Sequence, residues 1–132
     1  MNHFITDADR REIHADWWAE GEFVTIKLFS YVDKQRIWER SLVGLPERDA
    51  DGNTRFRMDS ALHAEVTLVM GIVDWTFTDD GDVPVPCTSD KKCALSDADG
   101  RFIFREIQAY NEERSAEAQE SFRAGSGSGT EE

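Results

Sequence analysis

Three clusters of aspartate and glycine are the residues of this chain best suited to binding a metal ion. They lie at positions 49–52, 79–82 and 97–100, and clustered carboxylate oxygens suit a hard cation such as calcium. An EF-hand loop, however, has glycine at its sixth position and glutamate at its twelfth. Counted from Asp49, glycine falls at the fourth position and Ser60 at the twelfth. We therefore expect no metal site and interpret the clusters as turns, whose backbone angles suit Asp and Gly.

The histidines and cysteines show no catalytic spacing. His3, His14 and His63 form no HxxxH or HExxH pair, and no histidine lies close enough in sequence to act as a base for Cys93. Cys87 and Cys93 are too few for a disulfide framework, so we expect two reduced thiols that serve as small apolar residues. The chain has no GxSxG, P-loop or dinucleotide-binding motif. We therefore expect no catalytic residues and no cofactor, and we predict that the protein is not an enzyme.

Tryptophan is more frequent than the core of a small domain requires. The chain has four tryptophans, at Trp17, Trp18, Trp38 and Trp75. Trp75 closes an apolar run and is predicted to be buried. The adjacent Trp17 and Trp18 cannot both point into one core from a single strand or helix face, and exposed aromatic side chains often anchor partners. We predict that Trp17 or Trp18 binds a partner protein.

Length and charge limit the classes of protein to consider. The chain has 132 residues, of which 39% are hydrophobic, and a formal net charge of −12. This length suits one modest domain with a core. The negative charge repels phosphate and argues against nucleic-acid binding. No stretch approaches 18 uncharged apolar residues, and the first residues carry no apolar signal region, so we expect neither membrane insertion nor export.

The first half of the chain is predicted to be rich in β-structure. In residues 22–45, the side chains of Val24, Ile26 and Leu28 alternate with more polar ones, which favours a strand. A turn at 32–34 followed by a second strand would make a β-hairpin, and this strand would carry Ile37, Trp38, Leu42 and Val43. Ile13, Trp17 and Trp18 are spaced to form one apolar stripe of a short helix. Residues 46–57, with proline, glycine and clustered acids, are predicted to be a loop.

The second half, residues 58–114, is predicted to be mainly helical. Asp59 or Ser60 can cap a helix whose apolar stripe is Leu62, Val66, Val69 and Val73, although its β-branched residues leave a strand next to Trp75 as an alternative. A short helical turn is expected from Thr88 or Ser89 to Leu95. The last helix has one apolar face, formed by Ile103, Ile107 and Tyr110.

These elements predict an α+β fold. We expect a single small domain at 1–114, in which an N-terminal β-hairpin or small antiparallel sheet precedes the helical part. Residues 115–132 contain the helix end and a Gly/Ser/Glu-rich tail, which buries too little apolar surface to order itself. We predict that this tail is flexible.

One stretch also resembles a known family. Trp75 is followed by Phe77, an acidic turn with Gly81, the sequence "VPVP" and the capping residue Thr88. With the elements on either side, over about residues 22–111, this pattern resembles small tail assembly chaperones of tailed bacteriophages and prophages of actinobacteria. The resemblance implies that the acids form a turn and that the prolines fix the entry to the next helix.

The resemblance implies a non-enzymatic function in the host cytoplasm during phage assembly. Such chaperones are thought to coat the long, apolar tape-measure protein and keep it soluble until the tail tube assembles, and other tail proteins are further expected partners. An acidic surface helps to keep such a complex soluble. Self-association stays open. The alternative is a small structural virion protein, such as a tail or head-completion subunit, that uses its hairpin for β-augmentation; a calcium-binding module is a third class.

Overall fold

A small antiparallel sheet organises the domain. The computed structural model describes residues 3–130, without the side chains of residues 118 and 121–130. Strands β1 (Arg10–Ile13), β2 (Val24–Lys27) and β5 (Ile72–Trp75) form the sheet in the order β1-β2-β5, and both pairings are antiparallel. The helices are α1 (Tyr31–Arg40), α2 (Ser60–Gly71), α3 (Ser89–Cys93) and α4 (Asp97–Thr130). The predicted α+β fold class is therefore confirmed.

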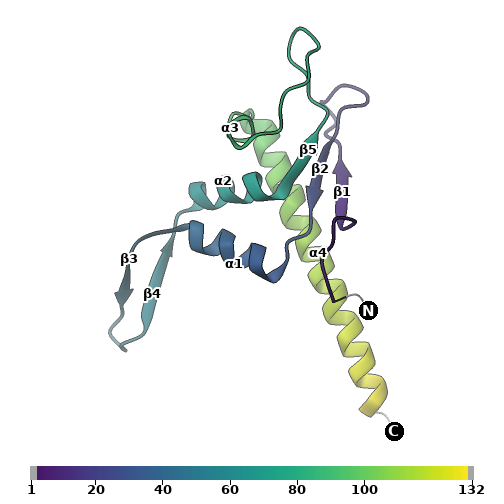
Figure 1. The fold of residues 1–132 in the computed structure, drawn as a ribbon. Helices are drawn as coiled ribbons and strands as arrows, with labels where there is room; N and C mark the ends of the chain where they lie inside the picture. The colour runs from purple at the N-terminus through teal and green to yellow at the C-terminus, as the bar shows by residue number, and fades with distance from the viewer. Residues whose placement is uncertain (1–2, 131–132) are drawn as a thin grey trace.

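The core lies between this sheet and the first half of α4, which crosses behind the sheet in Figure 1. The alternation predicted for the second strand is confirmed, because Val24, Ile26 and Leu28 are all buried. The apolar face predicted for the last helix is also confirmed. The core cluster comprises Ile13, Val24, Ile26, Leu28, Ile72, Trp75, Ile103, Ile107 and Tyr110. Burying each of the large apolar side chains contributes about 1.5–3 kcal/mol.

Helix α2 runs directly into strand β5. Asp59 caps α2 by accepting a hydrogen bond from the Leu62 N–H at 2.8 Å. The alternative strand next to Trp75 is present as β5. Leu62, Val66 and Val69 of the predicted apolar stripe are half-buried. The fully buried positions of α2 are Thr67 and Gly71, which the sequence did not predict. A Cβ atom at Gly71 would lie 2.7 Å from the Cδ1 atom of Ile107. Glycine therefore allows α2 to approach α4 closely.

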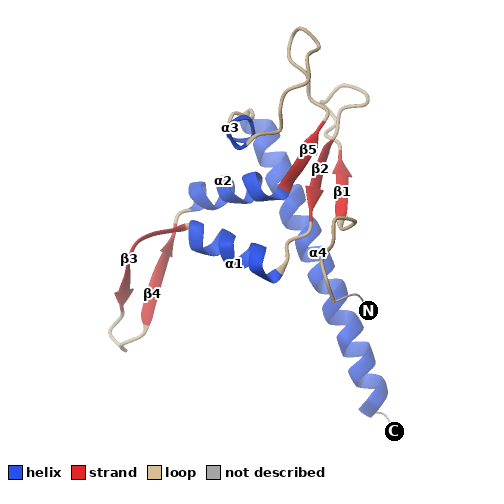
Figure 2. Cartoon of the chain, viewed as in Figure 1, coloured by secondary structure: helices blue, strands red, loops and turns tan. Residues whose placement is uncertain are grey.

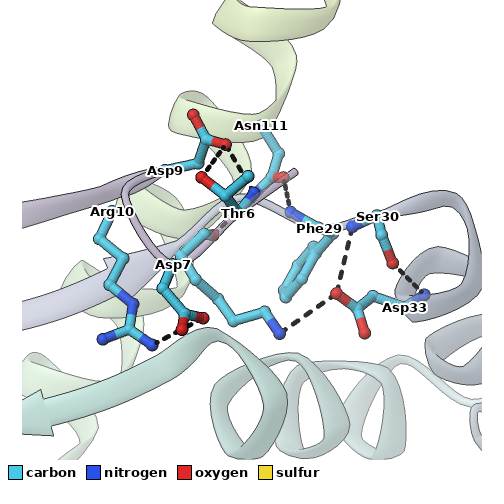
Figure 3. Close-up of polar contacts among 9 residues, drawn as sticks. Thr6, Asp7, Asp9, Arg10, Phe29, Ser30, Asp33 and Asn111 are labelled. Atoms are coloured by element: carbon cyan, nitrogen blue, oxygen red, sulfur yellow. Dashed lines mark hydrogen bonds and ion pairs between the residues drawn. The ribbon is translucent and has the colours of Figure 1, made fainter. Parts of the chain in front are cut away.

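The hairpin predicted for residues 22–45 is wrong, because Ile37 and Trp38 lie in helix α1. Leu42 and Val43 do lie in a strand, but that strand is β3, which does not pair with β2. Ser30 and Asp33 form a capping box, in which each side chain accepts a hydrogen bond from the other residue's backbone N–H at 3.1 Å. Figure 3 shows this cap beside Asn111 of α4, whose side-chain oxygen accepts a hydrogen bond from the Phe29 N–H. The cap satisfies backbone donors at the helix start and so favours helix over strand.

The loop predicted for residues 46–57 is also wrong. Strands β3 (Leu42–Arg48) and β4 (Thr54–Met58) pair in antiparallel fashion and form a separate two-stranded sheet. The Asp49 carboxylate closes the turn by accepting hydrogen bonds from the backbone N–H groups of Asp51 and Asn53. We call residues 42–58 the arm. Figure 2 shows that the arm projects from the ends of α1 and α2, away from the three-stranded sheet.

The N-terminal helix predicted around residues 13–18 is wrong as well, because β1 ends at Ile13 and turns follow it. The predicted short helix is α3, and Thr88 caps it. The Nζ atom of Lys92 donates hydrogen bonds to the carbonyl oxygens of Val69 and Ile72. A cation at the end of α2 satisfies carbonyl groups that have no partner within the helix.

The C-terminal half of α4 projects beyond the rest of the domain in Figure 1. The structure extends α4 to Thr130. Much of the segment at 115–132, which the sequence predicts to be flexible, lies outside the described side chains, and residues 131–132 lie outside the described residues altogether. The flexibility of this segment stays a prediction.

Candidate functional site

The two adjacent tryptophans converge on one carboxylate. After β1, the chain turns back over the start of α4, where Asp99 lies in the first helical turn. The Nε1–H groups of Trp17 and Trp18 donate to the same Oδ1 atom of Asp99, at 2.6 Å and 2.8 Å. Among residues 3–130, Asp99 forms no ion pair with a cation, and the N-terminus of α4 favours its negative charge. The pair therefore shares one anchoring point.

A chain of ring contacts links these tryptophans to the core. Trp17 and Trp18 each meet the ring of Phe102 edge-on, with centroids 5.4 Å apart. Trp18 contacts Phe77 at 5.2 Å, and Phe77 contacts the buried Trp75 at 5.4 Å. We call Trp17, Trp18, Asp99 and Phe102 the aromatic platform. Edge-to-face ring pairs contribute about 0.5–1.5 kcal/mol beyond area burial, so these contacts hold the platform in one conformation.

The two tryptophans differ in exposure. Trp18 is half-buried and packs against the core, whereas Trp17 leaves 58% of its surface exposed. Trp17 is thus a large apolar side chain that is fixed at one edge and open to solvent over much of its surface. Rigid aromatic side chains of this kind anchor protein interfaces, because little conformational entropy is lost when they bind.

The charge of Asp99 is stabilised by its donors. Partial burial acts to raise the pKa of Asp99, but the hydrogen bonds from Trp18, Trp17 and Ser96 outweigh it and lower the pKa below 3.8. The carboxylate is therefore ionised near neutral pH, and the hydrogen bonds that position both indoles are charge-assisted.

Two of the three acidic clusters form turns as predicted, whereas the turn predicted at 97–100 is wrong, because these residues begin helix α4. Asp49 closes the arm, and Oδ1 of Asp79 accepts hydrogen bonds from the N–H groups of Gly81 and Val83. Asp97 forms an ion pair with Arg101 at 2.9 Å. Among residues 3–130, no group of three or more His, Cys, Asp or Glu is placed to hold a metal ion.

The cysteines show no sign of activation as nucleophiles. Cys87 and Cys93 are both free. Burial raises the pKa of Cys87, and partial desolvation together with the Glu65 carboxylate raises the pKa of Cys93. A raised pKa keeps a thiol protonated, and the thiolate is the reactive form. His3 and His14 lie on exposed positions, while His63 contacts Ser41, Gln108 and Phe104.

A second surface was not predicted from the sequence. A groove of about 430 Å³ lies between α1, α2 and the middle of α4. Its apolar walls include Phe29, Ile37, Trp38 and Ile107. Trp38 also meets Phe56 of the arm edge-on, with ring centroids 5.3 Å apart. The groove and the arm are therefore neighbouring surfaces, joined at Trp38. The capping pattern at Ser30 and Asp33 was the sequence signal that would have placed Trp38 on a helix.

Comparisons with family models, with curated proteins and with solved structures found no match to this chain. Within the described residues, no helix combines the length and the apolar character that crossing a membrane requires.

Proposed function

We propose that this protein is a tail assembly chaperone of a tailed bacteriophage, which binds the tape-measure protein without catalysing a reaction. The observation that carries the proposal is Trp17, an indole that is 58% exposed although a hydrogen bond and a ring contact hold it in place. The segment from Trp75 to Thr88, which carries the resemblance to such chaperones, lies next to this platform through the contact between Trp18 and Phe77.

The client explains why the platform and the net charge occur together. A long helical protein presents an apolar stripe, and a rigid aromatic side chain covers such a stripe at low entropic cost. The charge of −12 on each copy makes coated clients repel one another. Binding through Trp17 and repulsion through the acids would together keep an aggregation-prone client in solution until tail assembly.

The test is coexpression with the tape-measure protein encoded in the same phage or prophage genome. We expect the tape-measure protein to move from the insoluble to the soluble fraction and to co-purify with the tagged chaperone. The Trp17→Ala variant should leave the client insoluble, whereas Trp38→Ala, which changes an exposed tryptophan on the other surface, should preserve its solubility. If both variants capture the client equally well, Trp17 is not the anchor. If the wild-type protein does not capture the client, the protein is not a chaperone of the tape-measure protein.

One observation favours the alternative function, a structural virion subunit. The arm exposes both of its strands away from the core, and exposed strand edges are used for β-augmentation. A virion subunit would be present in mature particles in a fixed copy number, whereas a chaperone would be absent from them.

A further inference from the structure

The loops around the aromatic platform carry acids and no cations. Residues 14–23 link β1 to β2, and residues 76–88 link β5 to α3. Together these two loops contain six acids and neither lysine nor arginine. In Figure 1, both loops lie toward the same end of the molecule as the start of α4. The exposed indole of Trp17 therefore lies in an acidic part of the surface.

Contacts between the two loops keep these acids together. The Oγ1 atom of Thr76 accepts a hydrogen bond from the Phe23 N–H at 2.8 Å, and the Thr76 N–H donates to the Phe23 carbonyl oxygen at 3.1 Å. Trp18 of the first loop meets Phe77 of the second edge-on, with ring centroids 5.2 Å apart. The two loops therefore form one continuous surface with the platform.

The acids on either side of Trp17 are unpaired. Asp16 and Glu20 are both exposed. Among residues 3–130, neither carboxylate forms an ion pair or a hydrogen bond. Both carboxylates are therefore free to meet a cationic partner beside the exposed indole.

The cations closest to the platform in sequence do not balance these acids. Arg101 is paired with Asp97 at 2.9 Å, and the Nζ atom of Lys92 donates to two backbone carbonyl groups of the domain itself. Lys91 and Arg105 are exposed. Residues 14–23 and 76–105 together contain nine acids and four lysines or arginines, a net charge of −5. The surface stays negative when every nearby cation is included.

An acidic surface with an exposed indole suits a partner that is both apolar and cationic. The face of a tryptophan ring attracts a lysine or arginine, whereas the acids repel phosphate groups and acidic peptides. An amphipathic helix places apolar side chains on one face and charged side chains beside them. One such helix can cover the indole and bring its cations to the neighbouring carboxylates.

We propose that the segment bound at the platform is a basic amphipathic helix. Its apolar stripe covers Trp17, and its flanking lysines or arginines meet Asp16 and Glu20. This assignment rests on the proposed function and adds to it the charge of the client segment. The acids select this segment among other apolar helices, because a helix flanked by acids would face like charges.

Calorimetry with two synthetic helical peptides tests the charge of the partner. Both peptides carry the same leucine stripe, and the flanking positions are lysine in one and glutamate in the other. We expect the lysine peptide to bind the wild-type protein, more weakly as the salt concentration rises. The glutamate peptide should bind at least about tenfold more weakly. Equal affinity for both peptides, or no binding of the lysine peptide, would overturn the proposal.

Charge-reversal variants locate the contact. Asp16→Lys/Glu20→Lys should weaken binding of the lysine peptide at least about tenfold, and Asp16→Asn/Glu20→Gln, which removes the charges without reversing them, should weaken it less. The control Glu39→Lys/Glu112→Lys makes the same change of net charge at exposed acids on α1 and in the groove, and it should bind like the wild type. Circular dichroism checks that each variant is folded. Equal losses in the reversal variant and the control would mean that net charge alone attracts the peptide, which contradicts the site.

Capture of the tape-measure protein separates this proposal from the proposed function. If the wild-type protein and Asp16→Lys/Glu20→Lys capture the client equally well, the chaperone function stands and the basic helix is contradicted. If the lysine peptide binds at Trp17 but the tape-measure protein is not captured, the basic helix stands and belongs to another protein, and the proposed function fails.

Discussion

A single carboxylate, Asp99, positions the surface on which the proposed function depends. The hydrogen bonds from Trp17 and Trp18 lower the pKa of Asp99 below 3.8. A carboxylate with a lowered pKa stabilises the folded protein above its unfolded-state pKa, and this contribution is lost as the pH falls through the folded-state pKa. The contribution of Asp99 is therefore complete near neutral pH and is lost below about pH 3.8.

This linkage predicts a change in tryptophan fluorescence. On acidification below pH 3.8, the wild-type protein should lose the fixed environment of both indoles as Asp99 becomes protonated. Asp99→Asn removes the charge but keeps an acceptor oxygen, so its indole emission should already be altered at pH 7 and should change less on acidification. Identical acid titrations of the two proteins would show that Asp99 does not hold the indoles.

Gly71 tests the contact between α2 and α4. Gly71→Ala would place a methyl group 2.7 Å from Ile107, whose side chain is buried and cannot move freely. Overpacking costs about 1–3 kcal/mol, and the better helix propensity of alanine offsets up to about 1 kcal/mol. We expect a net loss in the free energy of unfolding, measured by urea denaturation. Gly81→Ala, in an exposed turn, is the control; equal stability of both variants and the wild type would contradict the close approach.

At the scale of elements, the cap at Ser30 decides whether residues 31–40 form a helix. Ser30→Ala removes one half of the capping box and should lower the free energy of unfolding by about 0.5–2 kcal/mol. Ser60→Ala is the matched control, because Ser60 is the first residue of α2 and its helix is capped by Asp59. If chemical denaturation shows the same loss for both variants, the capping box does not stabilise α1.

Local patterns predicted some elements and misjudged others for physical reasons. Alternating side chains placed β2, and helical spacing placed the apolar face of α4, because both elements are buried on one side. The sequence around Ile37 and Trp38 fits a strand almost as well as a helix, and the cap at Ser30 decides between them. The arm escaped prediction because its apolar residues are exposed and its turn residues suggested a loop.

The candidate site depends on contacts that sequence spacing does not show. The choice of Trp17 or Trp18 followed from their adjacency, but their common partner Asp99 is 81 and 82 positions away. The groove could not be predicted either, because it needs α1, α2 and α4 to meet. Trp75 was predicted to be buried and is confirmed at 8% exposure.

On the scale of the whole molecule, the two surfaces lie at different places along α4. The aromatic platform lies at the start of α4 and is proposed to hold the client, whereas the groove lies beside the middle of α4.

The most direct test of the central claim is quantitative mass spectrometry of purified virions and of the lysate in which they assemble. The account predicts that the protein is abundant in the lysate, where it is bound to the tape-measure protein, and absent from mature particles. A fixed copy number in mature particles, with no complex between the protein and the tape-measure protein in the lysate, would contradict it.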